Sequence, residues 1–200
     1  MTHYHAARLW DPATPSDSRA VRAGLVAGTV ACATALTAAA AQVSVTLPGS
    51  PIPFTLQPVA VLLAGMVLGA RLGALSQVLY LAAGVAGASA FAWSPVLLPG
   101  AARLLGPTGG FLLAFPVAAG IAGLVRDRGI TRGAPGAAMS MVAGLAALYA
   151  GGIAWASLFA PASAGAVAAF APYVAADLVK IALVAPVVPA LRRAVFGARA

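Results

Sequence analysis

The sequence predicts an all-α integral membrane protein with six transmembrane helices and both chain ends in the cytoplasm. Three observations predict this class: an apolar composition, long stretches without charge, and basic residues gathered at the ends of those stretches. Of the 200 residues, 62% are hydrophobic and 8% are charged, against roughly 45–50% and 25% in soluble domains. So few charges would not cover a soluble fold, whereas lipid requires helices with an apolar exterior.

Uncharged stretches separate the predicted helices. Residues 23–70 carry no charge, which leaves room for two helices of about 20 residues and a connection. Pro48, Pro51 and Pro53 place that connection near residues 46–57. A third helix and a loop rich in Ser, Pro and Gly precede the fourth helix. The polar loop that begins at Arg126 separates that helix from the last two. The predicted helices are 23–43, 58–70, 72–87, 107–125, 137–159 and 167–191, the second and third being short, and the last two are divided near 160–165.

The basic residues predict the orientation. If the chain crosses the membrane six times, ten of the twelve basic residues lie on the same side of the membrane as the N-terminus. Basic residues favour the cytoplasmic side. Those ten are Arg8, Arg19, Arg22, Arg71, Arg126, Arg128, Arg132, Arg192, Arg193 and Arg199. We therefore expect a cytoplasmic tail over 1–20, a six-helix transmembrane domain over 21–195 and a second cytoplasmic tail over 196–200.

The first helix has an alternative interpretation as a cleavable signal peptide. Arg19 and Arg22 precede its apolar run, and the residues from Ala38 to Ala40 resemble a cleavage site. Cleavage would leave five helices and place the two chain ends on opposite sides of the membrane.

Several function classes are disfavoured. The net charge of +8 does not indicate nucleic acid, because the basic residues mark the ends of apolar stretches and no basic face alternates with aromatic residues. The single cysteine, Cys32, cannot form an intramolecular disulfide. His3 and His5 are the only histidines, so the sequence predicts neither a metal site nor a cofactor.

Asp177 and Lys180 are the most informative residues. Three positions apart, they face the same side of the last predicted helix. Each costs about 2.5–3.5 kcal/mol near the centre of a bilayer. Lys180 precedes Arg192 by twelve residues, or roughly 18 Å of helix, which places the pair at or just beyond the midplane toward the outside. The pair indicates a polar pocket for a small molecule, or alternatively an ion pair that only holds helices together.

Other polar groups fit a binding pocket better than an active site. Gln57 and Gln77 lie in apolar surroundings and need partners from a ligand or from neighbouring helices. The predicted spans contain neither a histidine nor a pair of acids. Lys180 is the only lysine and follows Val179, so a phosphate-binding loop is excluded. We expect no enzymatic activity and no ATPase motif.

Motifs along most of the chain resemble the BioY family. Two of them lie early: residues 51–57 read P-I-P-F-T-L-Q, and residues 63–69 read L-A-G-M-V-L-G. The match continues at Arg71, Gly73, Tyr80, Leu81, Gly84, Gly87, Phe91, the segment Gly106–Phe111, Gly123 and the Asp177-Leu178-Val179-Lys180 motif.

BioY proteins are the biotin-specific S components of energy-coupling-factor (ECF) transporters. The resemblance implies a six-helix S-component fold in a bacterial cytoplasmic membrane, with a substrate-binding domain that takes biotin from outside. A membrane-coupling T component and two ATPase A subunits of that family energise release inward, although some members work without dedicated partners. A homo-oligomer is left open.

The resemblance also implies roles for individual residues. Asp177 would accept hydrogen bonds from the ureido N–H groups, and Lys180 would either balance Asp177 or pair with the carboxylate of biotin. Arg103, the basic residue of the outer loops, would attract that anion, while the segment Gly106–Phe111 is interpreted as a helix entry. Small residues of the first helix resemble the surface that docks onto the T component. The aromatic candidates for packing on the ring are Tyr80, Phe91 and Trp93, and the docking candidates are Ala27, Ala31 and Ala35.

Three alternatives are left open. The nearest is an S component for another vitamin, because the fold is shared across ligands. The second is a membrane scaffold without a ligand, in which Asp177 and Lys180 are only structural. A membrane enzyme is disfavoured by the missing catalytic groups.

The orientation is testable with reporter fusions. We expect fusions at the N-terminus, after Arg128 and after Ala200 to read cytoplasmic, because the basic residues gather on that side. A fusion after Arg103 is the matched control and should read outside. A periplasmic signal from any of the first three would contradict the six-helix topology.

Overall fold

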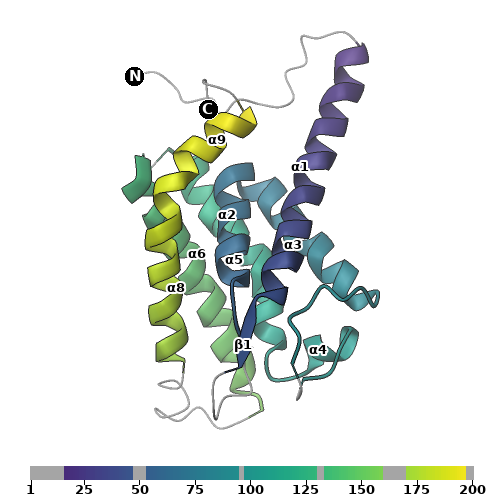
Figure 1. The fold of residues 1–200 in the computed structure, drawn as a ribbon, viewed down its shortest axis with the longest axis vertical. Helices are drawn as coiled ribbons and strands as arrows, with labels where there is room; N and C mark the ends of the chain where they lie inside the picture. Colours follow the sequence, from purple (N-terminus) through teal and green to yellow (C-terminus); the bar gives the residue numbers. More distant parts are fainter. Residues whose placement is uncertain (1–15, 47–52, 95–96, 130–132, 160–169, 197–200) are drawn as a thin grey trace.

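The computed structural model is a bundle of helices (Figure 1). It describes residues 16–46, 53–94, 97–129, 133–159 and 170–196. Most of the predicted N-terminal tail, the predicted C-terminal tail after Phe196, Pro48 and Pro51 of the first connection, and the predicted break near 160–165 lie outside the described residues.

The all-helical membrane fold is confirmed. Among the described residues, four helical stretches are long and apolar enough to cross a bilayer, the last being the continuous stretch Ala171–Phe196. Two shorter apolar helices occupy the positions predicted to be short. The described helices are α1 (Ser16–Gln42), α2 (Gln57–Leu68), α3 (Ala70–Val85), α4 (Ala101–Leu105), α5 (Gly109–Asp127), α6 (Gly133–Ala156), α8 (Ala171–Val184) and α9 (Val188–Phe196), with the 3-10 turn η1 (Ala185–Val187) before α9. Short α4 was not predicted.

The first and the last predicted helices differ most from the prediction. The first helix begins at Ser16 and not at residue 23, so it includes part of the predicted tail. The last predicted helix, 167–191, is divided into α8 and α9 by η1. Pro186 lies at the start of η1 and Pro189 follows in α9, and because proline has no N–H it interrupts regular helical hydrogen bonding.

A tight turn joins α2 to α3 and is fastened to the end of α5. Gly69, the only residue between the two helices, has φ 87°, a conformation that favours glycine. A Cβ atom at Gly73 would lie 2.6 Å from the Cα atom of Gly65, so the backbones of α2 and α3 touch near this turn. The amide of Ala70 donates to Asp127 Oδ2 at 2.9 Å, which ties the turn to α5.

The length of α2 positions the site. Its 12 residues rise about 18 Å, against roughly 30 Å for the hydrocarbon core. From the turn at Gly69, α2 therefore ends well short of the opposite end of the bundle. The chain enters α2 there through an antiparallel pair, β1 (Ser44–Thr46) and β2 (Pro53–Thr55), with Ser44 opposite Thr55. This arrangement leaves space beyond the start of α2.

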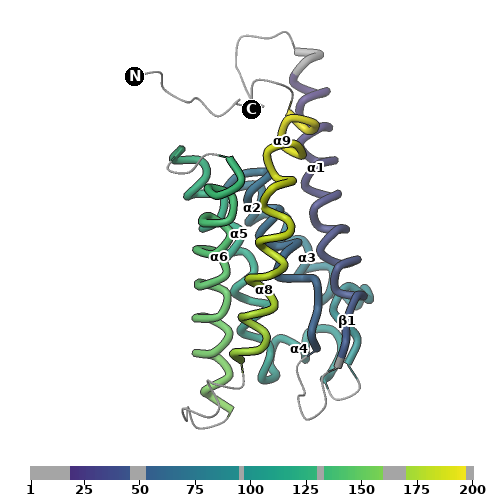
Figure 2. The backbone as a smooth tube through the Cα atoms, turned by 60° about the vertical axis from the view of Figure 1, so that its left-hand side comes forward, coloured from purple at the N-terminus to yellow at the C-terminus, as the bar shows by residue number. Residues whose placement is uncertain are grey.

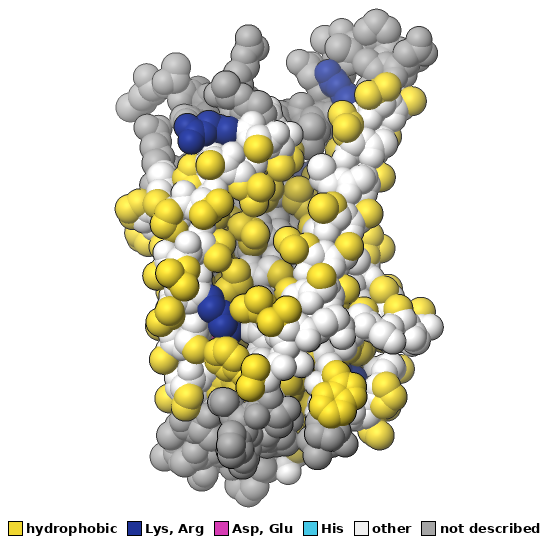
Figure 3. Space-filling view, viewed as in Figure 1, with side chains coloured by type: hydrophobic (Ala, Val, Ile, Leu, Met, Phe, Trp, Pro, Cys, Tyr) yellow, Lys and Arg dark blue, Asp and Glu magenta, His cyan; other side chains and the backbone are white. Residues whose placement is uncertain are grey.

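The core lies where α5 packs against α2, α3 and α6. Its fully buried side chains come from each of these helices and include Leu62, Tyr80, Met141 and Leu148. The start of α1, the α2–α3 turn and the end of α9 lie at the same end of the bundle (Figure 1). Figure 3 shows one face as largely apolar, with basic side chains near that end and a further basic group lower on the same face.

Helix α1 is the least embedded long helix. Only 11% of its most apolar stretch is buried, and its N-terminal half stands apart from the other helices in Figure 1. Figure 2 shows the same helix at the edge of the bundle, on the side away from α6. Its contact with α3 includes a hydrogen bond, in which the Thr34 hydroxyl donates to the Ser76 carbonyl oxygen at 2.9 Å. Cys32 is exposed on this helix.

Candidate functional site

A cavity opens beyond the start of α2, at the end of the bundle opposite the α2–α3 turn. Its walls come from β2, α2, the segment that connects α3 to α5, α5, α6 and α8. The empty space between these walls is about 700 Å³ when the open mouth is included. Most of its surface is apolar or aromatic, with a few polar side chains. This composition is typical of a ligand site.

A buried charged network occupies one side of the cavity. Asp177 on α8 is 3% exposed. Its Oδ1 accepts a hydrogen bond from Lys180 Nζ at 2.7 Å, and its Oδ2 accepts one from Tyr149 Oη at 2.8 Å. Lys180 Nζ also donates to the Thr55 carbonyl oxygen at 2.8 Å and lies 3.9 Å from the centre of the Phe54 ring. The network therefore joins α6, α8 and β2 around a neutral ion pair.

Arg103 places a cation elsewhere in the same cavity. It lies on α4 and is 7% exposed. Its Nε donates to the Leu98 carbonyl oxygen at 2.9 Å, and its Nη2 donates to that of Ala92 at 2.7 Å. Within the described segments, the ion pairs are those of Asp127 and Asp177, and neither includes Arg103. Burial lowers the pKa of the Arg103 guanidinium, yet an arginine remains charged near neutral pH.

Gln57 and Phe91 line the cavity, whereas Tyr80 supports it from behind. Tyr80 is fully buried; its hydroxyl accepts a hydrogen bond from Gln57 Nε2 and donates to the Ala90 carbonyl oxygen at 3.2 Å. The Tyr80 and Phe91 rings meet edge to face, with 5.6 Å between their centres. Tyr80 therefore fixes the two side chains that do reach the cavity.

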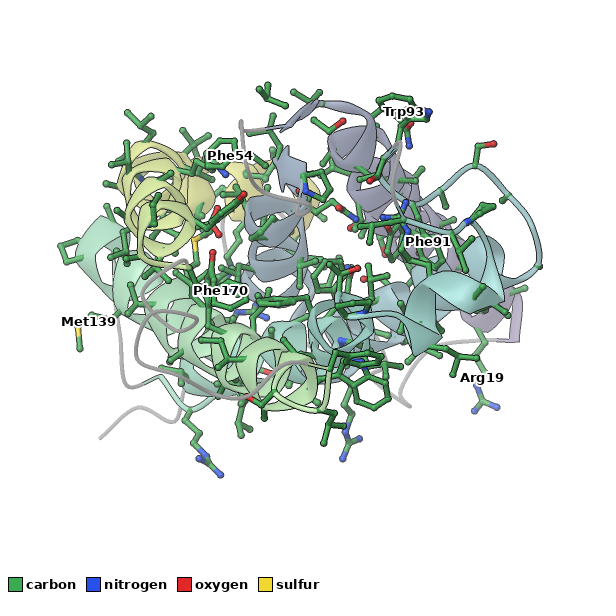
Figure 4. All side chains as sticks on the ribbon, turned by 90° about the horizontal axis from the view of Figure 1, so that it is seen from below. Arg19, Phe54, Phe91, Trp93, Met139 and Phe170 are labelled. Carbon is green, nitrogen blue, oxygen red and sulfur yellow. The ribbon has the colours of Figure 1, made fainter. Side chains whose placement is uncertain are left out.

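Gln77 and Trp93 lie outside the cavity lining. Gln77 is fully buried between α3 and α1, and its Nε2 donates to Thr37 Oγ1 at 3.3 Å and to Ser76 Oγ at 3.0 Å. These partners are Thr37 of the neighbouring helix α1 and Ser76 of α3 itself, rather than a ligand. Trp93 is 68% exposed, and Figure 4 shows it at the edge of the molecule. It lies in an irregular segment, where helical periodicity does not determine the direction of a side chain.

Aromatic residues that the sequence analysis did not select form much of the wall. Phe54 and Phe170 lie on one side of Figure 4 and Phe91 lies on the other. The Phe111 and Phe170 ring centres are 5.4 Å apart. Tyr149 was also not selected: a hydroxyl in an apolar helix needs a hydrogen-bond partner, but Ser140 on the same helix carries a hydroxyl too, so this signal does not distinguish Tyr149.

Comparisons with known proteins agree with this architecture. The model of the BioY family matches residues 16–197. The chain belongs to the BioY family. It is 39% identical over 153 residues to the probable biotin transporter BioY of Pyrococcus horikoshii, covering 76% of this chain and 87% of that protein. It is 34% identical over 150 residues to the biotin transporter BioY of Thermotoga maritima, covering 74% and 86%. The family resemblance predicted from the motifs is confirmed.

A solved structure supports the fold. The crystal structure of the S component for biotin from an ECF-type ABC transporter superposes with a TM-score of 0.77, covering 90% of this BioY chain and 95% of that chain. The two sequences are 21% identical, so this likeness concerns the fold. The predicted S-component fold is confirmed.

The charged network generates a stability prediction. We expect Lys180→Met to lower the midpoint of thermal unfolding in detergent, because it leaves the buried Asp177 carboxylate without its cation, at a cost of roughly 3–5 kcal/mol. The double variant Asp177→Asn/Lys180→Met should recover most of the loss, since it removes both charges. Arg193→Met, at an exposed position of α9, is the control. A double variant as unstable as Lys180→Met would contradict the role of the ion pair.

Proposed function

We propose that this BioY protein is the substrate-binding S component of an ECF transporter that captures biotin from outside the cytoplasmic membrane and releases it inward. Separate T and A subunits supply the energy. One observation carries the proposal: the cavity presents a buried carboxylate, Asp177, and, apart from it, a buried cation, Arg103, that forms no ion pair with a described carboxylate. Biotin has N–H donors at one end and a carboxylate at the other.

The ureido end of biotin fits the side of Asp177. Each oxygen of that carboxylate accepts one hydrogen bond in the structure, from Lys180 or from Tyr149. A carboxylate has about four acceptor positions, so both ureido N–H groups find acceptors without breaking the network. We assign Lys180 to balancing Asp177, because it already donates to that residue and to Thr55.

The bicyclic ring and the carboxylate fit the rest of the cavity. Phe91, Phe111 and Phe170 offer apolar surface for the ring. Arg103 is held by two backbone carbonyl oxygens and so faces an anion in a fixed position, which lowers the ordering cost of binding. Gln57 completes the proposed site, with Tyr80 as its support. Gln77 and Trp93 are left out because they lie outside the cavity lining.

The lined cavity favours a transport protein with a ligand over a scaffold, in which the ion pair would need no adjacent space. Another vitamin is the remaining alternative to biotin as the substrate, and titration of the purified protein distinguishes the two ligands.

We also propose that both chain ends lie in the cytoplasm, because the positions of the basic residues favour this orientation. The cavity then opens on the outer side of the membrane, where the substrate arrives.

Helix α1 is the proposed docking surface for the T component. Ala27, Ala31 and Ala35 are all exposed on this weakly embedded helix. Small residues spaced four apart let another helix approach closely in a membrane. A second copy of this chain is the alternative occupant of the same surface.

Binding to the purified protein tests the proposed site. We expect Asp177→Asn to weaken biotin binding by about 5- to 150-fold, because an amide N–H replaces an acceptor at roughly 1–3 kcal/mol. Asp127→Asn, which alters the carboxylate at the opposite end of the bundle, is the matched control. Titration calorimetry measures both, with other vitamins as competitors.

The double variant Asp177→Asn/Lys180→Met separates binding from stability. If Asp177 accepts hydrogen bonds from the ligand, the double variant folds and binds biotin no better than Asp177→Asn. Wild-type biotin affinity in the folded double variant would exclude this site. If the wild-type protein binds a different vitamin more tightly than biotin, that vitamin and not biotin is the substrate.

The docking surface generates a separate prediction. We expect Ala31→Trp to reduce association with the T component while biotin affinity stays unchanged, because the indole prevents close approach of a partner helix. Ala146→Trp, at an exposed position of α6, is the control. Co-purification measures association. Loss of biotin binding together with association would show that Ala31 packs inside this chain.

A further inference from the structure

The cavity contains a buried hydroxyl group without a partner. Thr108 lines the cavity, and the residue is 9% exposed. Its Oγ1 atom is buried and forms no hydrogen bond in the structure. A buried hydroxyl that lacks a hydrogen-bond partner costs about 1–3 kcal/mol. A ligand in the cavity is therefore a candidate for the missing partner.

The Thr108 hydroxyl does not cap the helix that follows it. Thr108 precedes α5 as its N-cap residue, where a threonine hydroxyl commonly accepts from an amide of the first turn. Here no side-chain capping bond forms, and the backbone of Thr108 has φ −93° and ψ 0° rather than the extended conformation typical of a cap. The hydroxyl therefore has no partner in the helix that Thr108 precedes.

The surroundings of Thr108 favour an anion. The first residues of α5, Gly109 and Gly110, follow it in the chain and are buried. The first turn of a helix carries partial positive charge, although the Gly109 amide itself already donates to the Gly106 carbonyl oxygen at 2.9 Å. Arg103 lines the same cavity. A guanidinium has five N–H groups, and two of those of Arg103 are engaged by the carbonyl oxygens of Leu98 and Ala92.

We propose that Thr108 Oγ1 donates a hydrogen bond to the carboxylate of the ligand, next to Arg103, and that this bond selects the free acid over its uncharged derivatives. The assignment deepens the proposed function and rests on it. Arg103 supplies long-range attraction for a negative charge, whereas a hydroxyl donor adds a short, directional contact. The Asp177 side does not compete for the carboxylate, because Asp177 is itself an anion and already neutralises Lys180.

Thr108→Val tests the proposal, since valine has nearly the same shape and lacks the hydroxyl. Titration of the full-length protein with biotin and with its methyl ester gives two affinities. We expect Thr108→Val to weaken biotin binding about 10-fold, because the bond to a charged acceptor is lost, and to weaken binding of the ester by no more than about 3-fold. Thr108→Ser should preserve the preference for the acid. Thr29→Val, on α1, is the control.

Each outcome decides the assignment. Unchanged biotin affinity in Thr108→Val, or equal losses for biotin and the ester, would overturn it, and the second result would assign Thr108 to the support of α5. Thr108→Ala repeats the measurement if the valine variant has a lower unfolding midpoint than the wild type. Failure of the wild-type protein to bind biotin would overturn the proposed function itself, which the wild-type titration reveals independently of Thr108.

Discussion

The ion pair between Asp177 and Lys180 is the constraint on which the site depends. An apolar bundle tolerates a buried carboxylate only if a cation and hydrogen-bond donors surround it. Lys180 and Tyr149 satisfy both carboxylate oxygens, and Lys180 also reaches the backbone of Thr55. The need to neutralise one acid thus brings α8, α6 and β2 together. These three elements form one wall of the cavity, so the same requirement that stabilises the acid also shapes the binding site.

The short α2 helix provides the space that this wall encloses. A full-length span would fill the region that Gln57, Arg103 and Phe91 now line. The turn at Gly69 anchors the other end of α2, where Asp127 holds the amide of Ala70. One end of the bundle is therefore closed by close backbone packing, and the other end is open to a small molecule.

The sequence predicted the helices well because lipid makes apolar length and charge position decisive. The residues that it singled out include five that line one cavity in the structure: Asp177, Lys180, Gln57, Phe91 and Arg103. The first three drew attention because polar groups are rare in an apolar chain, and Phe91 and Arg103 were selected through the family resemblance. The sequence did not predict where side chains of the irregular segment after α3 point, and Trp93 lies at the edge of the molecule for that reason. Tyr149 was omitted because its importance depends on the distance between α6 and α8, which no pattern within one helix contains.

The position of Cys32 gives the protein an intrinsic reporter. It is the single cysteine of the chain and lies exposed on α1, next to Ala31. A lipophilic thiol reagent therefore labels one site without any engineered residue, on the helix that is least covered by the rest of the bundle. The fluorescence or the spin-label mobility of a probe on this sulfur differs when α1 faces acyl chains and when it faces another polypeptide. Binding of a partner to α1 can therefore be followed in a membrane.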